Sequence, residues 1–101
     1  LVQGLNLNDY TLVQGDKFSF QLVYQHNETG ARVRVPSGRY TQPLSWRIEA
    51  CDWYGDWKER QALEHLRMGP RYARQAERFN QASQEYRRIA QCMRETGERL
   101  F

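Results

Sequence analysis

The sequence predicts an α+β fold, in which a small antiparallel sheet of three or four strands precedes a hairpin of two helices. Two observations predict it. Apolar and polar residues alternate through the first half of the chain, which is typical of strands with one buried face. After about residue 51 the apolar residues follow a helical period instead. No proline follows Pro70, so we expect the last helix to be long.

The length and composition predict one domain over residues 1–101. A chain of 101 residues and 12.1 kDa has little room for a second core. Its 40% of hydrophobic residues argue against wholesale disorder. We expect residues 1–51 to form a β-rich part and residues 52–101 a helical part. No apolar run approaches the roughly 20 residues that a membrane-spanning helix needs, so no membrane span is expected.

Strand-like alternation occurs in four segments. We expect a strand over residues 18–25, a glycine-ended hairpin loop at 26–30 and a return strand at 32–35. Alternation also predicts a strand over 44–51 and a short first strand within 5–13. The side chains expected on inner faces are Phe18, Phe20, Leu22, Tyr24, Val33, Val35, Leu44, Trp46, Ile48 and Ala50.

The helical half is expected to contain a short helix and a long one. Asp56 and Glu59 have the spacing of an N-cap and its capping-box partner, so a helix is expected from Trp57 to about Met68. Gly69-Pro70 would end it and begin the next helix, which runs to about Gly97. The inner face expected for the short helix consists of Ala62, Leu63 and Leu66.

Two columns at seven-residue spacing run along the long helix. The large column is Tyr72, Phe79, Tyr86, Met93 and Leu100, and the small column is Ala76, Ser83, Ala90 and Gly97. Small residues allow a facing backbone to approach closely. Two interpretations stay open. The first helix and the sheet cover this seam, or another chain completes it between Tyr86 and Leu100, as a homo-oligomer or in a larger assembly.

An aromatic group lies before the short helix, at Trp53, Tyr54 and Trp57. These rings either cap the core or form an exposed anchor, because Trp, Tyr and Arg are enriched at binding hot spots. The candidate partner-binding residues are Trp53, Tyr54, Trp57, Tyr86, Met93 and Leu100.

The net charge of +3 comes from 15 basic and 12 acidic residues, and every basic residue except Lys17 and Lys58 is arginine. Arginines beside aromatic rings can bind phosphates and stack on bases, so nucleic acid is the alternative partner. Acidic residues share the helix surface, however, which is more typical of a solvated face with ion pairs. The arginines proposed for nucleic acid are Arg32, Arg34, Arg71, Arg74 and Arg78.

Catalytic and metal-binding patterns are not found. The two histidines, His26 and His65, belong to no known catalytic motif, and there is no phosphate-binding glycine loop. The histidines and cysteines are scattered, without the paired spacing of a zinc site. We therefore expect a protein that is not an enzyme and has no metal or cofactor.

Cys51 and Cys92 are expected either to form a disulfide or to be two reduced, buried cysteines. A bridge closing so long a loop would stabilise the fold by roughly 4 kcal/mol. The chain begins at Leu1 rather than at a methionine, which fits cleavage of a signal peptide and equally fits trimming of a longer chain. We expect an extracytoplasmic location: periplasmic, secreted or in a virion.

Residues 14–22, with the sequence Gln-Gly-Asp-Lys-Phe-Ser-Phe-Gln-Leu, resemble the opening strand of small β-domains in phage tail and baseplate proteins. The helical half does not share this pattern. The resemblance implies an assembly component of phage or bacterial origin. We therefore expect a protein-interaction or assembly module, either a structural subunit of a phage- or envelope-type assembly or a small inhibitor or immunity-type protein. The alternative is a nucleic-acid-binding accessory protein.

Overall fold

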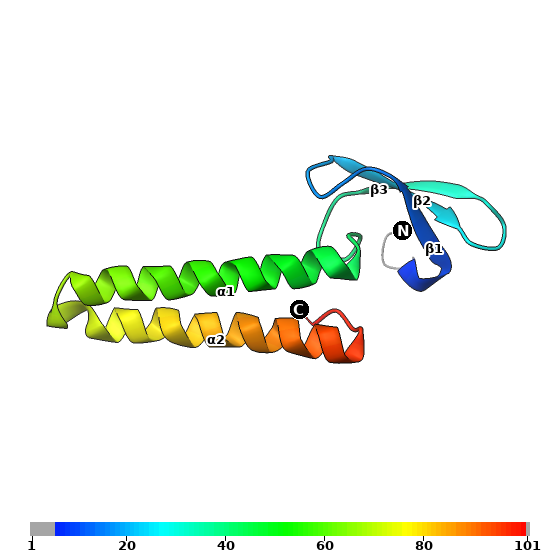
Figure 1. Cartoon of the computed structure of the whole chain (residues 1–101). Coiled ribbons are helices and arrows are strands. Elements are labelled where there is room, and N and C mark those ends of the chain that lie inside the picture. Colours follow the sequence, from blue (N-terminus) through cyan, green and yellow to red (C-terminus); the bar gives the residue numbers. More distant parts are fainter. Residues whose placement is uncertain (1–5, 101) are drawn as a thin grey trace. The chain divides into compact units, whose positions relative to one another are not determined.

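The computed structural model describes residues 6–100 and confirms the α+β class. Three strands are followed by two helices (Figure 1). The elements are β1 (Tyr10–Gln14), β2 (Gln21–His26), β3 (Arg32–Pro36), α1 (Leu44–Arg67) and α2 (Ala73–Thr96). Leu5, within the predicted first strand, lies outside the described residues. Contacts divide the chain into a β unit that ends at Trp46 and a helical unit that begins at Arg47.

The β unit is an antiparallel sheet in the order β1-β2-β3. Leu12 faces Tyr24 in the first pair of strands, and Leu22 faces Val35 in the second. Leu22, Tyr24 and Val35 are buried, which confirms the predicted inner face of β2 and β3. The partly buried side chains packed on them are Leu7, Tyr10, Leu12, Val33 and Trp46.

Phe18 and Phe20 do not belong to this core, although alternation predicted that they would. Phe18 is 86% exposed and Phe20 is 95% exposed, and β2 begins only at Gln21. The reason is a side-chain turn. The Phe18 N–H donates to Asp16 Oδ1 at 2.9 Å, and the Asp16 N–H donates to Ser19 Oγ at 2.9 Å. Such local bonds compete with the strand ladder and keep the segment in a turn.

Residues 44–51 are helical, so the predicted strand there is wrong. α1 begins at Leu44, well before the predicted start at Trp57. Leu44, Ile48, Cys51 and Gly55 are spaced by four, three and four, so the segment also fits a helical period. Asp56 and Glu59 consequently lie inside the helix and do not cap it.

The helical unit is an antiparallel hairpin, and α1 and α2 contain 24 residues each (Figure 1). Gly69 and Gly97 have positive φ angles of 124° and 73°, which fit the predicted ends of the two helices. The Gly97 N–H caps α2 by donating to the Met93 carbonyl at 2.9 Å. The buried residues of the two helices are Cys51, Gly55, Ala62, Ala76, Ser83, Ala90 and Met93.

Cys51 and Cys92 are not joined by a disulfide, so the bridged alternative is wrong. Cys51 is buried in α1, whereas Cys92 is only partly buried. Their positions therefore fit the alternative of two reduced cysteines. Among the described residues, no helix has the length and apolar character needed to cross a membrane.

Candidate protein-binding surface of the helical hairpin

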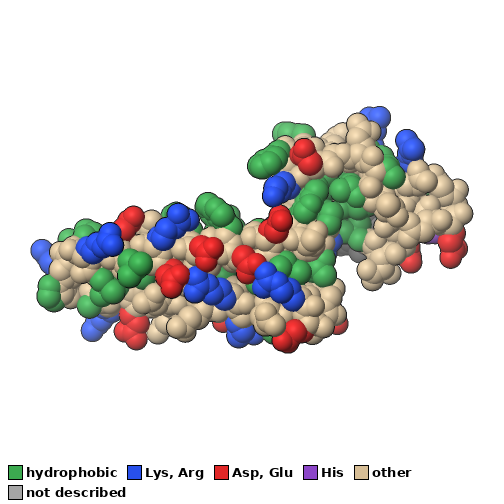
Figure 2. All heavy atoms as spheres, viewed as in Figure 1, with side chains coloured by type: hydrophobic (Ala, Val, Ile, Leu, Met, Phe, Trp, Pro, Cys, Tyr) green, Lys and Arg blue, Asp and Glu red, His purple; other side chains and the backbone are tan. Residues whose placement is uncertain are grey.

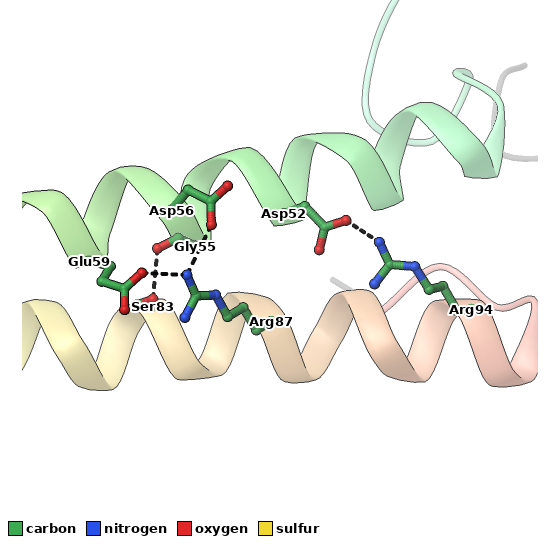
Figure 3. Close-up of polar contacts among 7 residues, drawn as sticks. All are labelled: Asp52, Gly55, Asp56, Glu59, Ser83, Arg87 and Arg94. Atoms are coloured by element: carbon green, nitrogen blue, oxygen red, sulfur yellow. Dashed lines mark hydrogen bonds and ion pairs between the residues drawn. The ribbon is translucent and has the colours of Figure 1, made fainter.

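Small residues bring the two helices of the hairpin into close contact. The Ser83 hydroxyl donates to the Gly55 carbonyl at 2.7 Å (Figure 3). A Cβ atom added to Gly55 would lie 3.0 Å from Arg87 Cγ and 3.4 Å from the Ser83 carbonyl oxygen. The space between the helices therefore admits few large side chains. Most large hydrophobic side chains of the hairpin are exposed instead.

One flank carries ion pairs between the helices. Arg87 Nη2 lies 2.9 Å from Asp56 Oδ1 and 2.7 Å from Glu59 Oε2, and Arg94 pairs with Asp52 (Figure 3). The hydrogen bond to Glu59, followed by that to Asp56, raises the pKa of Arg87 above its ordinary value. Acidic and basic side chains accordingly gather along the line between the helices (Figure 2). These exposed pairs help to set the helix register and contribute little to stability.

Aromatic side chains extend from the other flank onto the outer face of α1, since Trp53 and Trp57 are each two residues from the buried Gly55. Successive helical residues are rotated by about 100°, so Tyr54 and Asp56 point to nearly opposite sides of α1. The Tyr54 ring stacks on Tyr86 of α2, with ring centroids 5.3 Å apart. Trp53 and Trp57 are parallel within 6° at 6.4 Å, and Trp53 meets Tyr54 edge-on at 5.2 Å. We call Trp53, Tyr54, Trp57 and Tyr86 the aromatic surface.

A cation lies beside the aromatic surface. Lys58 Nζ is 5.0 Å from the centroid of Trp57 and 5.2 Å from that of Phe79 on α2. The His65 ring lies 4.9 Å from the same Phe79 ring. Cation–π attraction holds the ammonium group over the rings, and no carboxylate of the described residues forms an ion pair with it. The surface therefore combines aromatic area with positive charge.

The structure brings four of the six predicted partner-binding residues together. Trp53, Tyr54 and Trp57 are exposed, and Tyr86 is partly buried against Tyr54. Met93 is fully buried, so its side chain packs inside the unit instead of facing a partner. Leu100 follows the end of α2 and is partly buried. The large column therefore does not form one continuous surface.

Lys58 and Phe79 are neighbours of the surface that the predicted set did not include. Lys58 follows a tryptophan, and Phe79 is one heptad before Tyr86 in the large column. The spacing of Phe79 was therefore a usable signal. The position of Lys58 between two rings depends on the register of α1 against α2, which no local pattern reveals.

The arginines predicted for nucleic acid are divided between the units. Arg32 and Arg34 belong to β3, and Arg32 Nε donates to Gln25 Oε1 at 3.0 Å. Arg71, Arg74 and Arg78 belong to the helical unit and are exposed. Sequence spacing predicted a shared face within each set, but it did not show that the two sets belong to different units.

A shallow hollow lies where the hairpin loop after β2 meets Asp9. It is lined by Asp9, His26, Asn27 and Glu28. His26 Nδ1 lies 3.2 Å from the backbone nitrogens of both Glu28 and Thr29 and accepts from them. This histidine therefore shapes the loop. Within residues 6–100, no group of three or more His, Cys, Asp and Glu is arranged to hold a metal ion.

Comparison with protein-family models, with curated proteins and with solved structures finds no match. The function must therefore be inferred from the surface itself.

Proposed function

We propose that this chain is a non-enzymatic protein-binding or assembly module whose partner docks on the aromatic surface. One observation carries the proposal: Trp53, Tyr54 and Trp57 stay exposed on a hairpin whose interior is closed by small residues. Trp53 and Trp57 make their ring contacts within α1, so of these three rings Tyr54 alone stacks on the other helix. Exposed aromatic groups of this kind are typical of binding hot spots.

The contacts among the rings support the same proposal. Ring stacking and the cation over Trp57 hold the side chains in fixed positions before any partner arrives. A surface that is ordered in advance loses less side-chain entropy on binding. The positive charge of Lys58 also favours a partner with carboxylates near its apolar contact.

The kind of assembly and the location of the protein also belong to this proposal. A structural subunit of a phage- or envelope-type assembly and an inhibitor or immunity-type protein both stay open, because residues 16–20, within the segment that resembles an opening strand, form a turn. The extracytoplasmic location stays a prediction, without the disulfide to which it was linked. Nucleic-acid binding has weaker support, because its predicted arginines are divided between two units.

Site-specific photo-crosslinking in the source cell tests the proposal. A benzoylphenylalanine placed at Trp57 is expected to give one discrete protein adduct. An adduct with a second copy of the chain supports a homo-oligomer, and an adduct with another protein supports a larger assembly. The matched control is the same residue at Gln84, an exposed position of α2.

Two further results decide the outcome. Trp53→Ser should remove the adduct formed from Trp57 without loss of helicity by circular dichroism. Equal adducts from Trp57 and Gln84, or no adduct from either, would contradict the proposal.

A further inference from the structure

The turn end of the hairpin exposes aliphatic side chains. Leu63 and Leu66 were predicted to face the interior, but they are 50% and 51% exposed, and Met68 is 56% exposed. Ala62 takes the interior position in this part of α1. Because the close helix approach leaves no room for leucine between the backbones, these side chains lie on the surface around the turn.

The same end is rich in unpaired arginine. Residues 60–78 contain Arg60, Arg67, Arg71, Arg74 and Arg78, with only Glu64 and Glu77 to balance them. All five arginines are exposed, and none forms an ion pair with a described residue.

The ion pairs among the described residues of the hairpin lie further from the turn. They involve Arg87, Arg88 and Arg94. The turn end in Figure 2 accordingly shows mostly hydrophobic, Lys and Arg side chains. The hairpin is therefore divided into an ion-paired part and a positively charged, aliphatic tip.

We propose that this tip binds the surface of an anionic lipid membrane. We define the tip as Leu63, Leu66, Met68, Arg67, Arg71 and Arg74. Aliphatic side chains can enter the boundary between headgroups and acyl chains, while arginines bind the phosphates above it. Both contributions are needed for stable peripheral binding, and the tip supplies both.

The chemistry of the tip favours lipid over the other acidic partners. The ring in the turn belongs to Tyr72, which is partly buried, with the Arg71 guanidinium 5.6 Å from its centroid and the His65 ring at 6.2 Å. It therefore offers little free face on which a nucleic-acid base could stack. The connection at Gly69-Pro70 makes the tip a projection and not a groove. A projection needs a matching cavity in a protein partner, whereas a lipid surface deforms around it.

Vesicle flotation with the full chain tests this inference. The probe is vesicles of equimolar phosphatidylcholine and phosphatidylglycerol, compared with vesicles of phosphatidylcholine alone. We expect flotation with the anionic vesicles only. Arg71→Gln with Arg74→Gln should weaken binding roughly 30-fold, because each arginine near the surface contributes about a fivefold factor.

Controls separate the tip from net charge and from the aromatic surface. Arg88→Gln with Arg94→Gln removes the same charge far from the turn and should leave flotation nearly unchanged. Leu66→Ser with Met68→Ser should reduce it without altering helicity. Trp53→Ser should still float, since the aromatic surface is a separate site.

Three results would overturn the inference. They are no flotation with anionic vesicles, equal flotation of the tip variants and the unchanged chain, and tighter binding to a single-stranded oligonucleotide than to vesicles at equal phosphate concentration. The last result would assign the tip to nucleic acid.

Discussion

At the scale of single residues, Gly55 determines how closely the two helices approach. Its missing side chain leaves room for Arg87, and its carbonyl accepts the Ser83 hydroxyl bond. An added side chain would meet the Arg87 side chain and the Ser83 carbonyl oxygen, so Gly55 contributes through close packing and not through buried apolar area of its own.

Gly55→Leu is expected to destabilise the protein by about 1–3 kcal/mol, because the added atoms force the helices apart. Chemical denaturation followed by circular dichroism measures this loss. Gln84→Leu adds a similar side chain at an exposed helix position and should change the stability by less than about 0.5 kcal/mol. Equal effects of the two substitutions would show that the close approach is not required.

Substitutions at Phe18 and Phe20, unlike Gly55→Leu, are expected to leave the stability almost unchanged. Both rings are almost fully exposed, so Phe18→Ser with Phe20→Ser should change the free energy of unfolding by less than about 0.5 kcal/mol for each substitution. Leu22→Ser, in the buried core of the sheet, should cost several times more. Thermal unfolding of the two variants compares them directly. A large loss from the phenylalanine variant would mean that the rings are buried.

At the scale of elements, the exposed ion pair on α2 gives a pH dependence. The Arg88 guanidinium donates hydrogen bonds to the Glu85 carboxylate and holds the pKa of Glu85 below its ordinary value. The folded state therefore favours the charged carboxylate. This contribution is present above the ordinary glutamate pKa and is lost as the pH falls through the lowered pKa.

Glu85→Gln should consequently make the melting temperature less sensitive to acid. Thermal scans from neutral to acid pH measure the difference from the unchanged chain. Glu77→Gln is the control, because Glu77 forms no ion pair with a described residue. We expect a small effect, since both partners of the pair are exposed. A steeper acid dependence in Glu85→Gln would contradict the assignment.

The elements also show what periodicity can predict. The hairpin of β2 and β3 was predictable because the alternating residues and the glycine-ended loop point to one structure. Residues 44–51 fit a strand and a helix equally well, and their continuation into the 24-residue α1 decides the matter. At 16–20, a side-chain turn overrides alternation.

The candidate site was likewise predictable in part. The aromatic group at 53–57 was predictable from composition, because large rings at helical spacing are conspicuous in a sequence. The sequence did not predict which members of the large column stay on the surface. A column at seven-residue spacing does not reveal which of its side chains face the other helix of the hairpin. Two members of the column illustrate this: Met93 is buried, whereas the Phe79 ring packs beneath Lys58.

At the scale of the whole molecule, the two units have separate sets of buried side chains. The sheet buries Leu22, Tyr24 and Val35, whereas the hairpin buries mainly small residues from α1 and α2, together with Met93. A fragment of residues 44–101 contains all of α1 and α2. It should therefore remain helical, although so small a core gives the fragment only a low stability.

Circular dichroism and thermal unfolding of this fragment check the prediction. We expect most of the helical signal of the full chain and a broad transition. The same fragment with Gly55→Leu should melt at a lower temperature, which ties the signal to the packed hairpin. An unfolded fragment would show that the helices depend on the β unit.

The small-residue interior has a consequence for how such a chain can vary. Glycine, alanine and serine leave almost no lighter replacement, so most random substitutions there add volume where none is free. The flanks and the turn tolerate change more easily, because their side chains face solvent. Variation should therefore accumulate on the surfaces proposed to meet a partner or a membrane. A protein built in this way can acquire new binding preferences while its framework stays the same.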